Sequence, residues 1–284
     1  MKFKKIAILG PGLLGGSLAL SAVRHGLAET VALWARREEA VAQIRSRNIV
    51  ACASTELEPV VNGADLVVFA TPVGIMPNLA QAILPHISPG AIVTDVGSVK
   101  ARVVAQLEPI IQPKAFFVGS HPMAGTDKTG MEHATAHLFD QAACILTPTE
   151  NTDAEACRRL AYFWETVQCR VFFLSPEEHD RAVALVSHMP HLTAAALVNA
   201  TVSAGGENGL NLAGPGFRDC TRVALGSPAM WDEILSENKN AILSGLASLK
   251  QQIELAETAL QNDLSLLDFL EAAKKHREKT NRHS

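Results

Sequence analysis

The sequence has few cysteines, and they are scattered along the chain. Its 284 residues include five, and no two form a C-x-x-C pair or stand at the spacing of zinc ligands. An odd number argues against a complete disulfide framework and favours a reducing compartment. We therefore expect a cytoplasmic protein without a bound metal. The cysteines are Cys52, Cys144, Cys157, Cys169 and Cys220.

The sequence also lacks a basic excess and any long apolar run. Its formal net charge is −4 and its pI is about 6.2, so nucleic acid is not an expected partner. No apolar run approaches the ~20 residues of a membrane span. A basic N-terminus precedes Ile6–Leu9, but this run is only strand-length and a glycine-rich turn follows, unlike a signal peptide. What remains, 48% hydrophobic and 19% charged, is an ordinary soluble composition.

A glycine-rich turn follows the first expected strand, Ile6–Leu9. It reads G-x-G-x-x-G and leads into an apolar helical segment that Gly26 closes. In this context the first glycine permits the tight turn, the second lets a pyrophosphate approach the backbone, and the third lets the helix pack on the strand. The alternative is a tight βα turn without a ligand. The predicted dinucleotide-binding residues are Gly10, Gly12, Leu13, Leu14 and Gly15.

The second expected strand, residues 30–34, ends where the adenosine ribose of a dinucleotide would lie. An NAD site usually has an acidic residue there, whereas this chain has Ala35, Arg36 and Arg37, with Glu38 only afterwards. Two guanidinium groups suit a 2′-phosphate, so the pattern favours NADP over NAD. The alternatives are a solvated basic start to the next helix, and NAD binding with Glu38 on the ribose.

Strands and helices continue to alternate up to residue 174. The pattern predicts a Rossmann-type α/β domain over residues 1–175, with a doubly wound, mostly parallel sheet and helices on both faces. Ligands bind at the carboxyl ends of such strands. We expect His121 in a loop after the strand 115–118, projecting into that crevice, unless it merely caps a surface turn. Further strands are expected at 65–70, 91–96, 143–147 and 170–174, and a helix at about 153–167.

No strand pattern appears after Leu174. Ser175 and Pro176 read as a helix start, and apolar residues then recur at helical spacing, with Pro190 expected to kink or break the helix. A heptad-like seam from Leu235 to Leu260 predicts one long amphipathic helix covered by a partner subunit or, alternatively, packed within its own domain. We expect a helical substrate and dimerisation domain over residues 176–270 and a disordered polar tail over 271–284.

Five motifs then occur in order. They are the glycine turn extended to Ser17, D-V-G-S-V-K at 95–100, G-S-H-P-M-A-G-T-D at 119–127, S-H-M-P-H at 187–191 and F-R-D-C-T-R-V-A at 217–224, with Trp231 following. From about residue 4 to 265 the chain resembles the prephenate/arogenate (cyclohexadienyl) dehydrogenases of tyrosine biosynthesis. The resemblance implies a homodimer through the helical half. With no chorismate mutase or regulatory segment evident, we expect the stand-alone form.

The same resemblance implies the chemistry, which is oxidative decarboxylation of prephenate to 4-hydroxyphenylpyruvate with hydride transfer to NAD(P)⁺. It makes His121 the general base for the substrate 4-hydroxyl, Ser98 a partner of that hydroxyl, and Arg222 the ligand of a substrate carboxylate. Asp127 stands where the family often has Glu as part of an ionic gate near the substrate side chain. Because Asp is shorter than Glu, the sequence does not decide whether this chain has the gate. The other implied substrate residues are His179, His188, His191, Thr126 and Trp231, and the nicotinamide half would contact Thr71, Pro72, Asp95 and Gly97.

Other functions stay open at this level. Arogenate is an alternative substrate, with tyrosine formed directly or with both substrates accepted. A β-hydroxyacid dehydrogenase needs a catalytic lysine early in its helical domain, and Lys239 lies too deep in the sequence. A dinucleotide-sensing regulator would keep the glycine turn but would not need His121 and Arg222 together.

Overall fold

The computed structural model describes residues 2–126 and 128–280. The chain divides into two compact units, Met1–Asn238 and Lys239–Ser284. The first unit contains both sheets and the helices up to α10, and the second contains α11 and α12. From the end of the strand pattern we expected a domain boundary near residue 175. That boundary stays a prediction.

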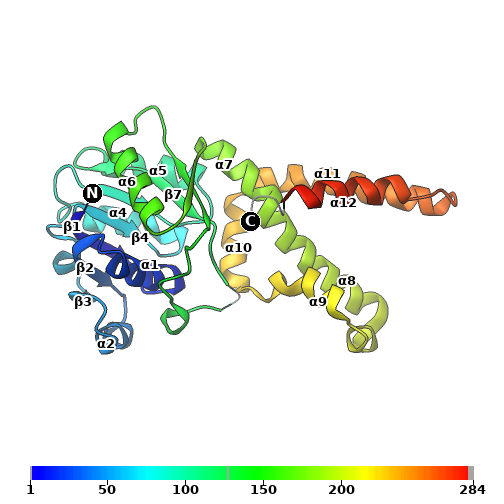
Figure 1. Ribbon diagram of the computed structural model, residues 1–284, viewed down its shortest axis with the longest axis horizontal. Helices are drawn as coiled ribbons and strands as arrows, with labels where there is room; N and C mark the ends of the chain where they lie inside the picture. The colour runs from blue at the N-terminus through cyan, green and yellow to red at the C-terminus, as the bar shows by residue number, and fades with distance from the viewer. Residues whose placement is uncertain (1, 127, 281–284) are drawn as a thin grey trace. The chain divides into compact units, whose positions relative to one another are not determined.

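A six-stranded parallel sheet organises the first unit (Figure 1). Its strand order, β3-β2-β1-β4-β5-β6, is that of a Rossmann fold, with the topological switch point between β1 and β4. The predicted doubly wound α/β sheet is therefore confirmed. The strands are β1 (Phe3–Leu9), β2 (Ala28–Trp34), β3 (Cys52–Ser54), β4 (Leu66–Phe69), β5 (Ile92–Asp95) and β6 (Phe116–Phe117).

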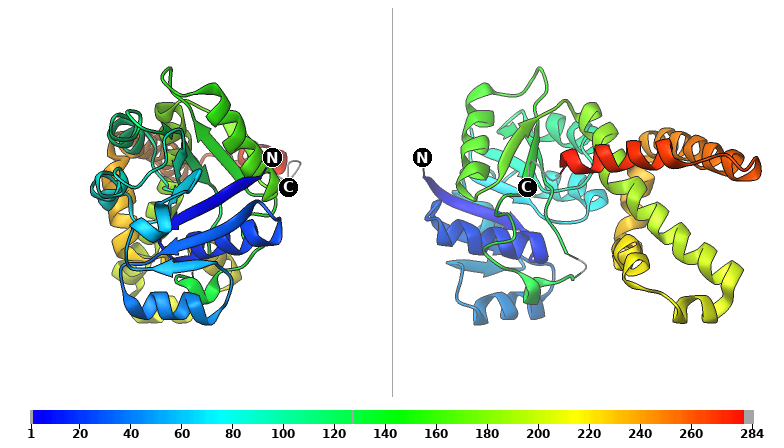
Figure 2. Two further views of the ribbon diagram at one scale, coloured as in Figure 1. Left: turned by 90° about the vertical axis from the view of Figure 1, so that its left-hand side faces the viewer. Right: turned by 45° about the vertical axis from the view of Figure 1, so that its right-hand side comes forward.

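Helices cover both faces of this sheet (Figure 2). Side chains alternate along β1, so Ile6 and Ile8 join one buried cluster and Ala7 and Leu9 join the other. The first cluster is completed by α1 (Leu13–Arg24) and α6 (Ala154–Thr166), and the second by α4 (Met76–Ile83) and α5 (Ala101–Ile111). The remaining elements of this region are α2 (Glu38–Ser46), α3 (Glu58–Val61), η1 (Val73–Ile75) and η2 (Met131–His133).

The strands after β6 form a second sheet of three, which corrects two expectations. The chain leaves β6 at Phe117 and enters β7 (Gly119–Pro122), which pairs antiparallel with β8 (Ala143–Thr147), and β8 pairs parallel with β9 (Arg170–Phe173). These later strands therefore do not extend the parallel sheet. His121 lies on a strand rather than in a loop, because its backbone is in register with Ile145.

The helical part of the first unit begins as the sequence predicted. Ser175 and Glu178 form a reciprocal capping box at the start of α7 (Pro176–Val183). A π-helical turn, Ala184–His188, then joins α7 to α8 (Met189–Asn211), so the irregularity expected at Pro190 lies just before this proline, which sits in the first turn of α8. After α8 come α9 (Pro215–Thr221), η4 (Arg222–Leu225) and α10 (Pro228–Glu237).

One helical stretch, Pro176–Gly206, is long and apolar enough to cross a membrane by length and composition alone. A mostly buried core helix of a soluble protein meets the same criterion, whereas 28% of this apolar window is buried. This stretch carries His179, Asp180 and His188, all buried within the protein. The first half of the stretch is thus packed in the protein, whereas Leu197 and Val202 further along it are exposed.

The second unit consists of α11 (Lys239–Gln261) and α12 (Leu267–Thr280). Two expectations were wrong here. The seam from Leu235 to Leu260 does not lie on one helix, because α10 ends at Glu237 and α11 begins at Lys239. The segment expected to be a disordered tail from residue 271 is helical as far as Thr280, and residues 281–284 lie outside the described part of the chain.

Candidate functional site

The glycine turn connects β1 to α1 at the switch point of the parallel sheet. Gly10 has a φ of +117°, and a Cβ there would lie 2.5 Å from the carbonyl oxygen of Ala70. A Cβ on Gly15 would overlap the carbonyl oxygen of Gly10. In contrast, a Cβ on Gly12 meets no atom within 4 Å, and no side chain caps the first turn of α1, which includes Leu13 and Leu14. The turn therefore leaves open space in front of uncapped helix amides, which is the arrangement that binds a pyrophosphate.

Arg36 and Arg37 follow the carboxyl end of β2, and both are exposed. Arg37 is the N-cap residue of α2, so the two guanidinium groups precede a helix N-terminus. The carboxylate of Glu38 accepts a hydrogen bond of 2.7 Å from the hydroxyl of Thr55. Two flexible cations are thus available at this edge of the sheet, while the nearest acid already has a partner.

The ends of β4 and β5 carry the residues expected near the nicotinamide. The hydroxyl of Thr71 is buried and has no hydrogen-bond partner among the described residues, and exposed Pro72 follows it as the N-cap residue of η1. Gly97 donates its N–H to a carboxylate oxygen of Asp95 at 2.8 Å. A Cβ on Gly97 would lie 2.7 Å from Val73, so only glycine fits there. These strand ends and the glycine turn offer a cradle and a free polar atom that fit a dinucleotide.

Asp95 and Lys100 form an ion pair that is fully buried beneath these strand ends. The carboxylate of Asp95 also accepts the N–H of Ser120, at 3.3 Å, and the ammonium of Lys100 also donates to the carbonyl of Val99, at 2.9 Å. Buried charges persist when they are paired and hydrogen-bonded in this way. Asp95 is therefore a structural partner of Lys100, which locks β5 to the start of α5.

Three side chains from two elements, β7 and α7, form a buried chain of hydrogen bonds, which we call the histidine relay: His121, His179 and Asp180. Nδ1 of His121 on β7 lies 2.8 Å from Nε2 of His179 on α7, and Nδ1 of His179 lies 2.8 Å from a carboxylate oxygen of Asp180. Their exposed fractions are 6%, 0% and 7%. Asp180 also accepts the backbone N–H groups of Lys100, at 2.7 Å, and Ala101, at 3.0 Å.

The electrostatics of the histidine relay favour neutral histidines next to a carboxylate. Burial lowers the pKa of His121 well below 6.5, and His179, Lys100 and His188 lower it further. Burial also lowers the pKa of His179, although its hydrogen bond to Asp180 opposes the shift. Burial alone would raise the pKa of Asp180, but the hydrogen bonds from His179 and from the amides of Lys100 and Ala101 outweigh it and hold the pKa below its ordinary value.

The two other histidines of this region both contact Trp231. His191 stacks on the indole, with ring centroids 3.6 Å apart, and His188 meets it edge-on, at 6.1 Å. Nδ1 of His188 lies 3.1 Å from the amide nitrogen of Asn238, which also donates to the carbonyl of Asp180. Burial lowers the pKa of His188 to about 4, against an opposing contribution from the Asp180 carboxylate. Nε2 of His188 is buried without a partner among the described residues. Nδ1 of His191 is buried without a partner in the described chain.

The other expected site residues have no described hydrogen bond to the histidine relay. Arg222, the first residue of η4, is exposed, and none of the hydrogen bonds described here joins it to the relay. Ser98 is half-buried, with its backbone near His188. The hydroxyl of Thr126 accepts the N–H of Lys128, at 3.1 Å. Asp127, expected at a gate, lies outside the described residues.

His179 has a different environment from the one expected for a substrate contact, because both of its ring nitrogens are engaged and it is fully buried. Sequence reasoning did not single out Asp180 or Asn238, and it gave Lys100 no role of its own. Neighbours in a helix such as His179 and Asp180 are not expected to face each other. The available signal was a third acidic residue in α7, which lies beyond the two acids of its first turn and next to a histidine.

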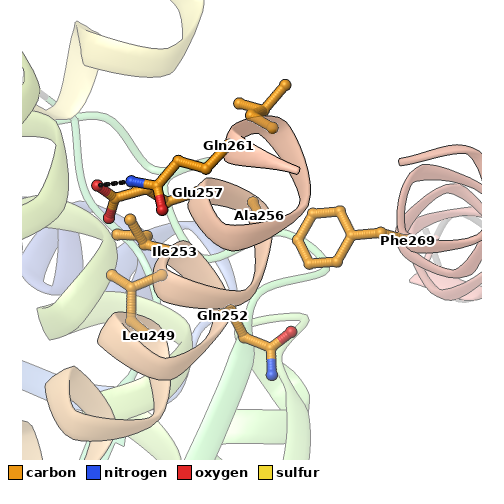
Figure 3. Close-up of a pocket in the computed structure, with 8 residues that line it drawn as sticks. Leu249, Gln252, Ile253, Ala256, Glu257, Gln261 and Phe269 are labelled. Atoms are coloured by element: carbon orange, nitrogen blue, oxygen red, sulfur yellow. Dashed lines mark hydrogen bonds between the residues drawn. The ribbon is translucent and has the colours of Figure 1, made fainter. Parts of the chain in front are cut away.

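The second unit offers an apolar groove between α11 and α12. In Figure 3 the ring of Phe269 on α12 points toward Ala256 on α11, and Gln261 donates to Glu257 at 3.3 Å. The groove contains no group suited to acid–base chemistry, apart from one paired carboxylate. Within residues 2–126 and 128–280, no cluster of three or more His, Cys, Asp or Glu side chains is arranged to hold a metal ion.

Two family models match the chain. Residues 18–173 match the prephenate dehydrogenase nucleotide-binding domain, and residues 175–272 match the prephenate dehydrogenase dimerization domain. Together the two models span most of the chain, and they meet where the strand pattern of the sequence ends.

Individual proteins agree with these models. The chain is 34% identical to a cyclohexadienyl dehydrogenase of Zymomonas mobilis, over 96% of this chain and 94% of that protein. It is 34% identical to a prephenate dehydrogenase of Bacillus subtilis, over 96% and 75% of the two chains. The crystal structure of A. aeolicus prephenate dehydrogenase in complex with hydroxyphenyl propionate and NAD⁺ is 30% identical, covers 99% of both chains and gives a TM-score of 0.92. Synechocystis arogenate dehydrogenase is 31% identical, covers 97% of this chain and 99% of its own, and gives a TM-score of 0.84.

Proposed function

The chain belongs to the prephenate dehydrogenase family, and we propose that it catalyses the oxidative decarboxylation of prephenate to 4-hydroxyphenylpyruvate with a nicotinamide dinucleotide as acceptor. The observation that carries this proposal is the buried histidine at the carboxyl side of the parallel sheet, held neutral and hydrogen-bonded at Nδ1. A neutral imidazole on the strand that hydrogen-bonds to the end of β5, through Ser120 and Asp95, is equipped to take the proton of a substrate hydroxyl.

In this proposal His121 accepts a hydrogen bond from the 4-hydroxyl of the substrate, and Ser98 contributes a second contact to the same hydroxyl. As C4 acquires carbonyl character, His121 draws the hydroxyl proton toward Nε2. CO₂ then leaves C1. The electrons of the broken C–C bond complete the aromatic ring and place negative charge on the 4-oxygen, which takes the proton back from Nε2. When bound, the nicotinamide supplies the hydride acceptor for C4.

We assign substrate recognition mainly to side chains of the helical part of the same unit. Arg222 is exposed and carries a planar guanidinium, which suits a substrate carboxylate. His191 has a buried nitrogen without a partner among the described residues, and it forms an aromatic wall with Trp231 and His188. We assign Thr126, on the loop after β7, to the same pocket. The expectation for Asp127 stays one from the sequence. His179 belongs to this site because its Nε2 is hydrogen-bonded to Nδ1 of His121.

We propose that the enzyme prefers NADP⁺, although NAD⁺ is the ligand named for the A. aeolicus relative. The support is the pair of exposed arginines after β2 together with the engagement of Glu38 by Thr55. One charge-assisted phosphate contact is worth about 1.5–3 kcal/mol, which corresponds to roughly a ten- to hundredfold preference. The double variant Arg36→Ala/Arg37→Ala should raise KM for NADP⁺ and leave KM for NAD⁺ nearly unchanged.

The deciding experiment is an assay of the purified protein with each pairing of prephenate or arogenate with NAD⁺ or NADP⁺, followed by the absorbance of the reduced cofactor. Prephenate with NADP⁺ should give the highest kcat/KM. A higher value with arogenate would make arogenate the substrate and tyrosine the direct product. A higher value with NAD⁺ would contradict the proposed cofactor preference and make Glu38 the candidate ribose ligand. No reduction in any pairing would refute the function.

We also propose that the chain forms a homodimer through its C-terminal helices, as the name of the matching family model suggests. On α11 and α12, exposed apolar side chains such as Leu243, Ile253, Leu260 and Leu270 have no described cover. Replacing Leu246 and Ile253 by Asp should give monomer or aggregate in sedimentation experiments. A stable wild-type monomer at micromolar concentration would contradict the dimer.

A further inference from the structure

We propose that Asp180, acting through His179, fixes the tautomer of His121 so that its Nε2 presents a lone pair to the substrate. The inference rests on the proposed function of His121 as the base and assigns positioning roles to His179 and Asp180. Neither positioning residue needs to touch the substrate, because the relay is a linear chain of three buried groups joined by two hydrogen bonds of 2.8 Å each.

The direction of every proton in the relay follows from its far end. An ionised carboxylate only accepts hydrogen bonds. Asp180 already accepts two backbone N–H groups at the start of α5, which stabilise its ionised form. Nδ1 of His179 must therefore carry the proton in the bond to Asp180, so Nε2 of a neutral His179 carries a lone pair. Nδ1 of His121 must then donate to that lone pair, and Nε2 of His121 is left unprotonated.

The surroundings of the relay strengthen this ordering. The ring of His121 faces the ammonium of Lys100, which is paired with Asp95, as well as His179 and His188. These neighbours disfavour a second proton on the imidazole at rest. When the substrate proton arrives at Nε2, the resulting imidazolium still donates from Nδ1 to His179, whose other nitrogen is held by the carboxylate. The relay thus keeps the base neutral at rest and oriented during turnover.

The same logic makes the relay sensitive to an amide in place of the carboxylate. In Asp180→Asn, an amide N–H donated to Nδ1 of His179 would move the proton of His179 to Nε2. His179 would then donate to Nδ1 of His121, and the proton of His121 would move to Nε2, where the lone pair is needed. In a serine protease triad, a carboxylate-to-amide change that leaves the wrong tautomer lowers kcat by about 10⁴.

The test compares replacements at His179, because Asp180 also holds the start of α5 and its variant has a second reason to unfold. His179→Gln retains a carbonyl oxygen that is able to accept the Nδ1 proton of His121, whereas His179→Leu fills space without accepting a hydrogen bond. We expect kcat of His179→Gln to stay within about tenfold of wild type and kcat of His179→Leu to fall by about 10²-fold or more. KM for prephenate should change less than threefold in both, and folded Asp180→Asn should resemble His179→Leu.

A spectroscopic measurement reports the tautomer without turnover. With ¹⁵N-labelled histidine, ring nitrogen shifts of wild-type His121 should show a protonated Nδ1 and a bare Nε2, and those of His179→Leu should show loss of this preference. Equal kcat in His179→Gln and His179→Leu, or a wild-type His121 protonated at Nε2, would overturn the proposal. Failure of the proposed function is distinguishable, because the wild-type protein would then reduce neither dinucleotide with prephenate or arogenate, whereas the ¹⁵N shifts would still report the tautomer of His121.

Discussion

The glycine turn and the histidine relay lie in the same unit, but they are built differently for the ligands that we propose, the dinucleotide and the substrate. The turn is made of backbone: Gly10 and Gly15 are packed against other main-chain atoms, Gly12 faces open space, and the amides of α1 are left uncapped. The relay is made of side chains, is closed to solvent, and orders its protons through its hydrogen bonds. The turn is therefore sensitive to added atoms, and the relay is sensitive to exchanged donors and acceptors.

The largest expected effect comes from removing the base at the end of the relay. His121→Asn should keep the fold and the affinity for substrate, since the replacement is smaller and polar, and should lower kcat by roughly 10²–10⁴-fold. Steady-state kinetics with a thermal unfolding scan would measure both. A near wild-type kcat in the purified variant would show that the relay does not serve catalysis.

Arg222 belongs to neither the glycine turn nor the histidine relay, since it is exposed and has no described link to the relay. Its replacement therefore tests substrate binding separately from both regions. Arg222→Ala should remove a charge-assisted carboxylate contact worth about 2–4 kcal/mol, lowering kcat/KM by roughly 30- to 1000-fold, mainly through KM. Dinucleotide affinity, measured by fluorescence titration, should barely change. An unchanged KM for prephenate would exclude the role.

The buried neutral histidines predict acid sensitivity of stability. Above the unfolded-state pKa of 6.5, His188 is neutral in both states, whereas below it the unfolded chain takes up a proton that the folded chain resists until about pH 4. The free energy of unfolding should therefore fall as the pH drops from 6.5, by about 2–3 kcal/mol at about pH 4.5 from His188 alone. His121 and His179 are shifted in the same direction and add to the loss.

Urea denaturation at neutral and acidic pH would measure this dependence. His188→Asn is a suitable comparison, because asparagine can still accept the hydrogen bond of Asn238 but does not titrate. The pH-dependent loss should be smaller in this variant than in wild type. An equal loss in both proteins would show that His188 is not the source.

The smallest effect separates two glycines of the same turn. Gly15→Ala would press a methyl group against the carbonyl of Gly10, which should lower the free energy of unfolding by about 1–3 kcal/mol. Gly12→Ala meets no neighbour, so its stability should change by less than about 0.5 kcal/mol while dinucleotide affinity falls. Equal stability losses in the two variants would mean that the turn is not shaped by backbone packing.

The sequence by itself determined the glycine turn, the alternation of strands and helices, and the capping box at Ser175. These features depend on neighbours a few residues apart, whose spacing and conformational needs are visible in the chain. It also singled out His121, but as a loop residue. The strand that carries His121 has only four residues, all buried, so it shows no alternation of apolar and polar residues that would predict a strand.

Only the tertiary structure decided what surrounds that histidine. His121 and His179 are 58 positions apart, and the two backbone amides that hold Asp180 come from residues 79 and 80 positions away. Such contacts arise when β7 and α7 pack against the start of α5, and no local periodicity encodes them. The last helix reaches Thr280 for a local reason, since it is exposed and rich in helix-forming residues. The tertiary structure, however, ended α10 before the expected seam was complete, where Asn238 bonds to Asp180 and His188. In these places helix ends and long-range packing, rather than the spacing of apolar residues, set the outcome.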